Sequence, residues 1–306
     1  MSSIVIFMCT YNGENFLEEQ LLSIERQIYQ DWKLIVSDDG SSDNTINILK
    51  EYKVKWGEDK LTIVNGPQKG FSENFLSIIK KSQIVASYYA FADQDDIWEK
   101  EKIQISLNFL SKVKKGCTAM YCSRTRLIDK KNNEIGFSTY FNKKPSFKNA
   151  LVQSIAGGNT MVINYEAKKL MEIASAGSNV VTHDWLIYQI ITGSNGYVLY
   201  DKWASVRYRQ HDNNKIGNNN NFYARMIRIY LLFNGDFKKW INQNLKALNK
   251  VNNYISKENK DVINQLHDLR SKSIIVTIFS IKKCMLYRQT FLGNIALIIG
   301  IILKRI

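Results

Sequence analysis

Three carboxylates stand within four positions of the chain: Asp93, Asp95 and Asp96 occur in the stretch ADQDDIWEK, after the apolar run at residues 84–91. Carboxylates this close repel one another unless positive charge lies among them. Oxygen ligands of this kind suit Mg²⁺ and Mn²⁺, and such an ion can bridge to the phosphates of a nucleotide. The cluster therefore predicts a site for a divalent cation that carries a nucleotide diphosphate.

Other phosphate-binding patterns do not occur in the sequence. It contains no G-x-G-x-x-G after the first predicted strand and no G-x-x-x-x-G-K-[ST]. Rossmann dinucleotide sites and P-loops are thereby excluded, and a carboxylate-bound cation is the remaining way to hold phosphates. Cys117 and Cys122 lack a second pair of ligands, so a zinc site is not expected.

The elements that must position the cluster alternate between strands and helices. Apolar runs predict strands at residues 3–10, 32–40, 60–66 and 85–93, and helical spacing predicts helices at 14–27, 42–55 and 71–83. Such alternation is typical of a parallel sheet with right-handed crossovers, whose ligands bind beyond the carboxyl ends of the strands. The polar stretches CTYNG, SDDGSSD and ADQDD end three of these strands. For Asp39 and its neighbours, a turn followed by a helix cap explains the pattern equally well.

Composition sets the remaining limits. The chain has 306 residues, 45% of them hydrophobic, which allows one large domain or two smaller ones. Four scattered cysteines and an N-terminus without a signal-peptide pattern predict a reducing, cytosolic compartment. The net charge is +14, and residues 236–306 hold 13 Lys and Arg against 4 Asp and Glu, a net +9. This excess favours nucleic acid or an anionic membrane, although a solvated basic helix surface explains it equally well.

The C-terminal part has a different pattern. After about residue 221 it predicts helices without strands, so we expect a catalytic domain over 1–221 and a basic helical region over 222–306. Apolar runs in 273–306 are about nine residues long, whereas a bilayer crossing needs ~20. Apolar faces flanked by Lys and Arg suit helices that lie in the membrane interface. The alternative is a helical pair packed on the catalytic domain.

These motifs together resemble family 2 glycosyltransferases with the GT-A fold. The resemblance covers nearly the whole chain and is carried, in order, by CTYNGENFLEEQLLSIERQ, LIVSDDGSSDNT, ADQDDIWEKEKI, GGNTMVIN, HDWLIYQIITG, YRQHDNNKIG and MLYRQTFLGN. In pattern it is most similar to bacterial rhamnosyltransferase-like enzymes of O-antigen, capsule and cell-wall polysaccharide assembly. It implies an α/β fold with a Rossmann-like, mostly parallel sheet flanked by helices, and a C-terminal helical region.

The resemblance also implies an activity. We expect an inverting, metal-dependent transferase that moves rhamnose or a hexose from a dTDP- or UDP-linked donor to a saccharide on polyprenyl diphosphate. Mg²⁺ or Mn²⁺ would be the cofactor, and nucleic acid would not be a partner. The expected location is the inner face of the bacterial plasma membrane, where the protein would be peripheral on an anionic lipid surface.

Roles at the nucleotide-sugar site follow from matching positions. The resemblance implies that Asp39 contacts the base, with Thr10 and Tyr11 lining the same pocket. Asp93 and Asp95 would bind the nucleotide-sugar, one carboxylate meeting the ribose and another the metal.

The resemblance implies metal-binding and catalytic roles as well. The metal ligands would be Asp95 first, with Asp96 and His211, although His211 could equally be satisfied by backbone groups. Asp184 would be the general base, and its alternative role is to cap the helix that follows it.

An acceptor or sugar pocket completes the set. Gly158 and Asn159 would border it, although a tight turn explains GGNT without a ligand. Trp98 and Trp185 could stack on a sugar, while a core position is the commoner role of such aromatics. His183 would orient the base or cap a helix.

Two other classes remain as alternatives. A nucleotidyltransferase also uses carboxylates and Mg²⁺, but the stretch MCTYNGEN lacks a basic residue to hold a triphosphate. A nucleic-acid-binding protein would explain the charge, but no helix-turn-helix, zinc-finger or RNP pattern occurs, and acidic strand ends suit phosphate backbones poorly.

Overall fold

The computed structural model describes residues 3–81, 83–211, 234–273, 276 and 285–306. The chain divides into two compact units, each assembled from several segments. The first comprises Met1–Tyr140, Ala156–Glu172 and Tyr197–Asn214, and the second comprises Phe141–Ile155, Ile173–Gly196 and Lys215–Ile306. The boundary that the sequence predicts near residue 221 lies outside the described residues.

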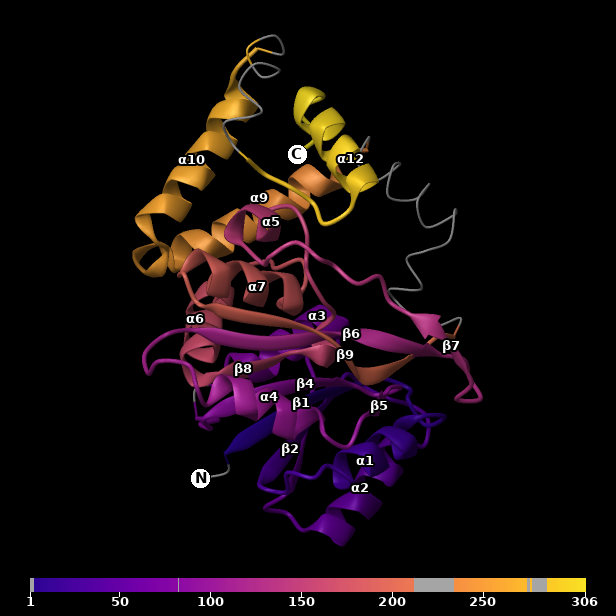
Figure 1. Ribbon diagram of the computed structural model, residues 1–306. Coiled ribbons are helices and arrows are strands. Elements are labelled where there is room, and N and C mark those ends of the chain that lie inside the picture. The colour runs from indigo at the N-terminus through magenta and orange to yellow at the C-terminus, as the bar shows by residue number, and fades with distance from the viewer. Residues whose placement is uncertain (1–2, 82, 212–233, 274–275, 277–284) are drawn as a thin grey trace. The chain divides into compact units, whose positions relative to one another are not determined.

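The first unit is built on one sheet (Figure 1). Its strands are β1 (Ile4–Thr10), β2 (Trp32–Asp38), β3 (Leu61–Asn65), β4 (Tyr88–Asp93), β5 (Ile97–Trp98), β6 (Ala119–Ile128), β7 (Glu134–Phe137), β8 (Val162–Asn164) and β9 (Tyr197–Arg209). Its helices are α1 (Leu17–Glu25), α2 (Thr45–Trp56), α3 (Phe71–Ile79), α4 (Lys102–Leu110) and the 3₁₀ turn η1 (Gly158–Thr160); α6 (Tyr165–Ser175) begins in this unit and ends in the other. The strand order is β3-β2-β1-β4-β8-β6-β9-β5, with β7 beside β6.

The sheet confirms the predicted α/β class. Strands β3, β2, β1 and β4 are parallel, β8 runs antiparallel between β4 and β6, and β6 and β9 are again parallel. The four predicted strands and three predicted helices of the first hundred residues all form, with ends shifted by a few residues.

Strand β1 lies in the interior of the sheet, between β2 and β4, and both of its faces are apolar. All seven of its residues are buried, and successive side chains of a strand point to opposite faces. Ile6 and Met8 belong to the core cluster that includes Leu17 of α1. Phe7, on the other face, stacks on Tyr89 of β4 with ring centroids 5.6 Å apart. The burial on both faces fixes β1, and with it the position of the loop that follows.

The strand register aligns the ends of four strands. Thr10 pairs with Asp38 across β1 and β2, Cys9 with Asp93 across β1 and β4, and Asp38 with Asn65 across β2 and β3. Because these strands are parallel, the loops after all four leave the sheet at the same edge. The predicted nucleotide and metal residues of the first hundred positions belong to these loops or to the strand ends.

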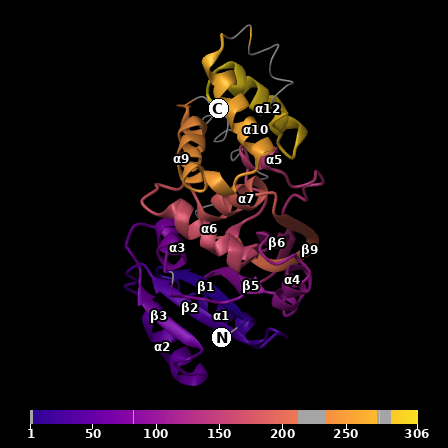
Figure 2. The ribbon, with the colours of Figure 1, turned by 90° about the vertical axis from the view of Figure 1, so that its left-hand side faces the viewer.

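The described part of the second unit is helical, as the sequence predicts for the C-terminal part (Figures 1 and 2). Its helices are α5 (Phe147–Ala150), α7 (His183–Gly193), α9 (Asp236–Lys250), the 3₁₀ turn η2 (Asn252–Tyr254), α10 (Lys257–Ser271) and α12 (Phe291–Ile302). Helix α7 is almost wholly buried and packs against α5 and α9. None of the helices in the described ranges combines the length and hydropathy that a membrane crossing requires.

Candidate active site

The loops after β1 and β4 are joined by one side chain. Gln94 accepts a hydrogen bond from Tyr11 N at 2.8 Å through its Oε1 and donates from Nε2 to Tyr11 O at 3.1 Å. A Cβ on Gly13 would lie 2.4 Å from Gln94 Oε1, so this approach needs glycine. The Tyr11 ring is 59% exposed and free to face a ligand. Gln94, the middle residue of the D-Q-D motif, has no role in the sequence-based prediction, and in the structure it positions the predicted base pocket.

Asp38 organises the loop after β2. Its carboxylate accepts hydrogen bonds from the Thr10 hydroxyl at 2.8 Å, the Ser41 hydroxyl at 2.5 Å, and the backbone N–H groups of Gly40 and Ser41 at 3.1 and 2.8 Å. Thr10 is 1% exposed. The expectation that Thr10 lines the nucleotide pocket is not supported, because its side chain is buried and bonded to Asp38.

Asp39 lies beside it in a different setting. Its two carboxylate oxygens accept from the backbone N–H groups of Gln68 at 2.6 Å and Gly70 at 2.9 Å. A Cβ on Gly66 would lie 2.8 Å from Asp39 Oδ1 and 2.7 Å from Asn74 Oδ1. The loop after β3 therefore fixes Asp39 at the sheet edge, where it stays half-exposed.

Asp95 meets His211 at the same edge. Asp95 Oδ2 lies 2.8 Å from His211 Nε2, although 116 positions separate the two residues. The His211 ring lies beside Phe16, with centroids 5.3 Å apart. Asp93 stands at the end of β4 opposite Cys9, whose thiol pKa is raised by burial and then by the charge of Asp93. The structure thus brings His211 to Asp95 in the loop that follows Asp93.

Asp96 points elsewhere. It is fully buried, its Oδ2 accepts from Asn159 Nδ2 at 2.6 Å and its Oδ1 from Arg209 N at 3.3 Å. Burial raises its pKa well above the usual value, and the charge of Asp95 adds to that effect. No set of three His, Cys, Asp and Glu side chains in the described ranges could hold a metal ion. The predicted third ligand, Asp96, is therefore a structural carboxylate.

The turn that contains Asn159 supports the acidic loop from behind. Gly158 and Asn159 are both buried, and Asn159 O accepts from Lys102 Nζ at 2.6 Å. Burial lowers the Lys102 pKa to about 7, against the opposing charge of Asp96. Trp98 is 3% exposed and lies in the core with the Lys102 ammonium 4.2 Å from its ring. The structure does not support the acceptor-pocket roles predicted for Gly158, Asn159 and Trp98.

Arg209 holds the acidic loop through the Asp95 backbone and pairs its charge with Glu19. It is the last residue of β9, and its side chain is fully buried. Its Nε donates to Asp95 O at 2.9 Å, its Nη1 to Asn132 Oδ1 at 2.6 Å and its Nη2 to Glu19 Oε2 at 2.8 Å. The guanidinium also lies 4.4 Å from the Phe16 ring centroid. The sequence showed Arg209 only as a neighbour of His211, since nothing local indicates which arginine of a strand is buried.

The predicted base belongs to the second unit. Asp184 is the second residue of α7 and is half-buried, and its Oδ1 accepts from Trp185 N at 2.7 Å. The helix cap position is Thr182, so Asp184 is not the N-cap. Burial lowers the pKa of His183 to about 4, against the opposing charge of Asp184. Trp185 is 7% exposed and donates to Ala150 O at 2.6 Å. Trp185 is thus a core side chain and does not offer its ring to a sugar.

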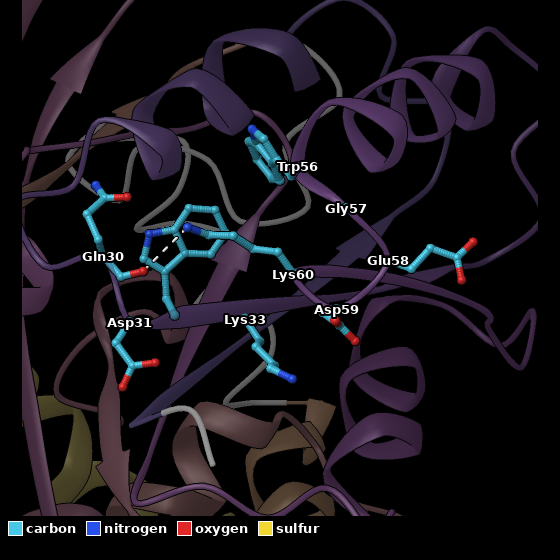
Figure 3. A pocket seen from close by; sticks show the side chains of 9 residues that line it. Gln30, Asp31, Lys33, Trp56, Gly57, Glu58, Asp59 and Lys60 are labelled. Carbon is cyan, nitrogen blue, oxygen red and sulfur yellow. Dashed lines mark hydrogen bonds between the residues drawn. The ribbon is translucent and has the colours of Figure 1, made fainter.

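A hollow of about 430 Å³ lies away from these residues, lined by residues 30–33 and 56–60 (Figure 3). Lys60 reaches across it, with its ammonium 4.0 Å from the Trp32 ring and a hydrogen bond of 3.4 Å to Gln30 O. These segments precede or begin β2 and β3, so the hollow lies at the amino ends of the strands. The polar side chains with candidate roles lie at the carboxyl ends.

The sequence profile described as Glycosyl transferase family 2 matches residues 5–170, more than half of the chain. The chain belongs to this family. It is 32% identical over 267 residues to dTDP-rhamnosyl transferase RfbG of Shigella flexneri, a match that covers 82% of this chain and 88% of that protein.

Two further proteins are similar to this family 2 glycosyltransferase. It is 30% identical over 111 residues to UDP-Glc:alpha-D-GlcNAc-diphosphoundecaprenol beta-1,3-glucosyltransferase WfgD of Escherichia coli, over 36% of this chain and 38% of that one. The structure of mannosyltransferase PcManGT from Pyrobaculum calidifontis, in complex with GDP-Man and Mn²⁺, superposes with a TM-score of 0.51 at 14% identity, over 99% of this chain and 86% of that one. The fold is thus GT-A, as expected.

Because the Arg209 guanidinium is buried, we expect even a conservative substitution of Arg209 to lower the stability of the fold strongly. Arg209→Lys keeps one positive charge but cannot reach three acceptor groups at once. Because buried polar partners are then left unpaired, we expect the free energy of unfolding to fall by about 3 kcal/mol. Chemical denaturation measures this loss.

The control for that experiment is Arg207→Lys. Arg207 stands two residues earlier in β9, pairs with Glu99 and has a side chain 39% exposed. We expect a loss within about 1 kcal/mol for this exposed pair. Equal losses in the two variants would contradict the role of Arg209.

His183 predicts a pH dependence of stability. Its pKa is about 4 in the folded protein against 6.5 for an ordinary histidine. Between these values the unfolded chain binds a proton that the folded chain does not, so stability is lost as the pH falls from 6.5 to 4. The loss can reach about 3 kcal/mol.

Denaturation curves of His183→Gln across this range test the prediction, with the exposed His267→Gln as control. We expect a shallower dependence on pH for His183→Gln alone. The same slope in the wild type and both variants would show that His183 is not the group responsible.

Proposed function

We propose that the protein transfers rhamnose or a hexose, with inversion, from a dTDP- or UDP-linked donor to a saccharide carried on polyprenyl diphosphate. The observation that carries the proposal is the convergence of Asp39, Asp95 and His211 at the carboxyl edge of the sheet. The name of the RfbG relative, a dTDP-rhamnosyl transferase, supports this donor class. Rhamnose is therefore the first donor sugar to test.

Asp95 and His211 fit a divalent cation. Their Oδ2 and Nε2 atoms share a hydrogen bond of 2.8 Å. An ion would replace that hydrogen bond with little movement of either side chain, because neighbouring ligands of an octahedral ion with bonds of about 2.1 Å lie about 3.0 Å apart. Two protein ligands leave the other positions for water and diphosphate oxygens, which is the usual manner of Mg²⁺. Bound Mg²⁺ or Mn²⁺ would offset the negative charge that develops on the leaving diphosphate. Asp96 is left out of this set because its side chain is fully buried and bonded to Asn159.

The neighbouring residues suit the rest of the donor. Asp39 presents a half-exposed carboxylate that can accept a hydrogen bond from an N–H of the base. The exposed Tyr11 ring lies in the adjoining loop and offers a surface for the same group. Asp93, at the end of β4, is assigned to the ribose.

Asp184 is proposed as the general base. The acceptor oxygen forms a bond to the anomeric carbon while the bond from that carbon to the diphosphate oxygen breaks. The hydroxyl proton passes to the Asp184 carboxylate, and the nucleoside diphosphate leaves with the electron pair of the broken bond. A single displacement of this kind inverts the anomeric configuration. The family resemblance of HDWL and the absence of an N-cap role for Asp184 support this assignment.

One relative supports the acceptor and the location that we propose. The name of the WfgD relative gives an acceptor on diphosphoundecaprenol, and an acceptor of this kind resides in a membrane. We therefore propose that the protein works as a peripheral protein at the inner face of the bacterial plasma membrane. The net charge of +14 supports contact with anionic lipid.

The test of function combines a donor panel with a lipid-linked acceptor. With Mn²⁺ present, we expect dTDP-rhamnose or a UDP-sugar to give a glycosylated lipid and free nucleoside diphosphate. Asp95→Asn is expected to abolish transfer, because it removes a charged ligand, while the exposed Asp59→Asn at the opposite sheet edge leaves it intact. Full activity in excess chelator would refute the requirement for a divalent cation. Release of pyrophosphate from a nucleoside triphosphate would indicate a nucleotidyltransferase instead.

Asp184→Asn tests the chemistry. We expect turnover to fall about 10²- to 10⁴-fold with donor affinity nearly unchanged, because a positioned base acts only in the transition state. The control is Glu166→Gln, which alters an acidic residue in the first turn of α6. Similar turnover in the two variants, or a product that keeps the anomeric configuration of the donor, would exclude Asp184 as the base.

A further inference from the structure

Helix α12 is apolar on two opposite sides. None of its twelve residues is charged, and Leu297, Gly300 and Ile301 are buried on one side. Spacings of three and four residues bring the remaining large side chains together on another side. Those exposed side chains are Phe291 (78%), Leu292 (61%), Ile295 (41%), Ile298 (45%) and Ile299 (40%). We call this set the α12 outer face.

The helix that carries this face is anchored before its first turn. Gln289 accepts from Lys143 N and donates to Lys143 O, each at 3.1 Å, so its amide pairs with the backbone in both directions. Asn294 accepts from Arg288 N and donates to Arg288 O, each at 2.8 Å. Thr290 caps the helix through a bond from Gly293 N.

The far end is anchored as well. Lys304 Nζ donates to Leu269 O at 2.5 Å, and Arg270 Nε donates to Ile306 O at 2.8 Å, so the end of α10 holds the chain beyond α12. The α12 outer face is therefore presented by a helix fixed at both ends.

Positive charges frame the apolar face. Arg288 precedes the helix, and the exposed Lys143 and Lys144 belong to the segment that holds its start. The exposed Arg305 follows its end, whereas the Lys304 ammonium is bonded to Leu269 O and is not counted among these charges. Residues 285–306 contain three Lys and Arg and no Asp or Glu. A partner that matches this pattern is apolar along its middle and anionic at both ends.

We propose that the α12 outer face inserts into the headgroup–acyl boundary of an anionic lipid bilayer, with these cations on the lipid phosphates. Twelve residues give a length of about 18 Å, which is short of the roughly 30 Å hydrocarbon core. The helix thus lies in the plane of the interface. The inference rests on the proposed function, whose polyprenyl-linked acceptor lies in such a bilayer, and it names the surface that meets it.

A second copy of the chain fits this surface less well. In a two-fold dimer through α12 the helices run antiparallel, or cross, with both chains offering the same face. Either way, the cationic ends of one copy would meet cations or apolar groups of the other, since residues 285–306 offer no carboxylate side chain to pair with them. Like charges at close range disfavour this contact.

Flotation with lipid vesicles tests the proposal on the full chain. We expect the wild type to bind vesicles of phosphatidylglycerol and phosphatidylethanolamine and to bind phosphatidylcholine vesicles much more weakly. Leu292→Glu and Ile298→Glu should each lower binding to the anionic vesicles at least about tenfold, because a charge must then enter the apolar layer. The uncharged variant Leu292→Gln should bind the anionic vesicles more strongly than these two variants and more weakly than the wild type.

The matched control is Val54→Glu, which adds the same charge at an apolar side chain of α2 that is 87% exposed. We expect it to bind as the wild type does. The proposal would be overturned if the wild type did not bind the anionic vesicles. It would also be overturned if Val54→Glu and Leu292→Glu bound them equally well. Loss of a dimer in Leu292→Glu by sedimentation, with vesicle binding unchanged, would assign the face to a second copy.

A transfer assay in the same variants separates this proposal from the proposed function. With a soluble acceptor analogue we expect Leu292→Glu to match the wild type, because α12 contributes no residue to the candidate site. Failure of the wild type to transfer any sugar, together with normal vesicle binding, would refute the function and leave the lipid surface standing.

Discussion

The buried guanidinium of Arg209 is the interaction on which the candidate site depends. It binds the backbone of the acidic loop, α1 through Glu19 and the β6–β7 turn through Asn132, in three different directions. A planar fork of fixed donors can do this, whereas a single ammonium cannot. The backbone N–H of the same residue donates to Asp96. The loop is thus held from the inside, which leaves the Asp95 carboxylate directed toward His211 at the sheet edge.

In two pairs of neighbouring aspartates, the two carboxylates have different surroundings. At the end of β2, Asp38 is buried and accepts three hydrogen bonds from its own loop and one from Thr10 of β1, while Asp39 stays half-exposed. After β4, Asp96 is buried between Asn159 and Arg209, while Asp95 faces His211. One acid of each pair fixes the loop, and the other is the one for which we propose ligand contact. The buried members are stable because protein donors replace the water they lose.

The strands, the helices between them and the edge of the sheet that bears the site could be predicted from the sequence. Apolar runs such as IVIFMCT, each followed by a polar stretch, are local patterns that predict these strands. The structure has a strand at each of the four predicted positions. The division between Asp95 and Asp96 could not be predicted, because it depends on Asn159, which is 63 positions away from Asp96. The contact between Arg209 and Glu19 spans 190 positions. Trp98 and Trp185 follow acidic motifs as sugar-stacking residues do, and only their burial shows that they belong to the core.

The most direct test of the account is a crystal structure with Mn²⁺ and dTDP, in which the anomalous signal of the ion locates it without reference to the protein. The account predicts Mn²⁺ within bonding distance of Asp95 and His211, with diphosphate oxygens completing its coordination and Asp96 still bonded to Asn159. An ion bound by Asp96, or one bound without Asp95, would contradict the account.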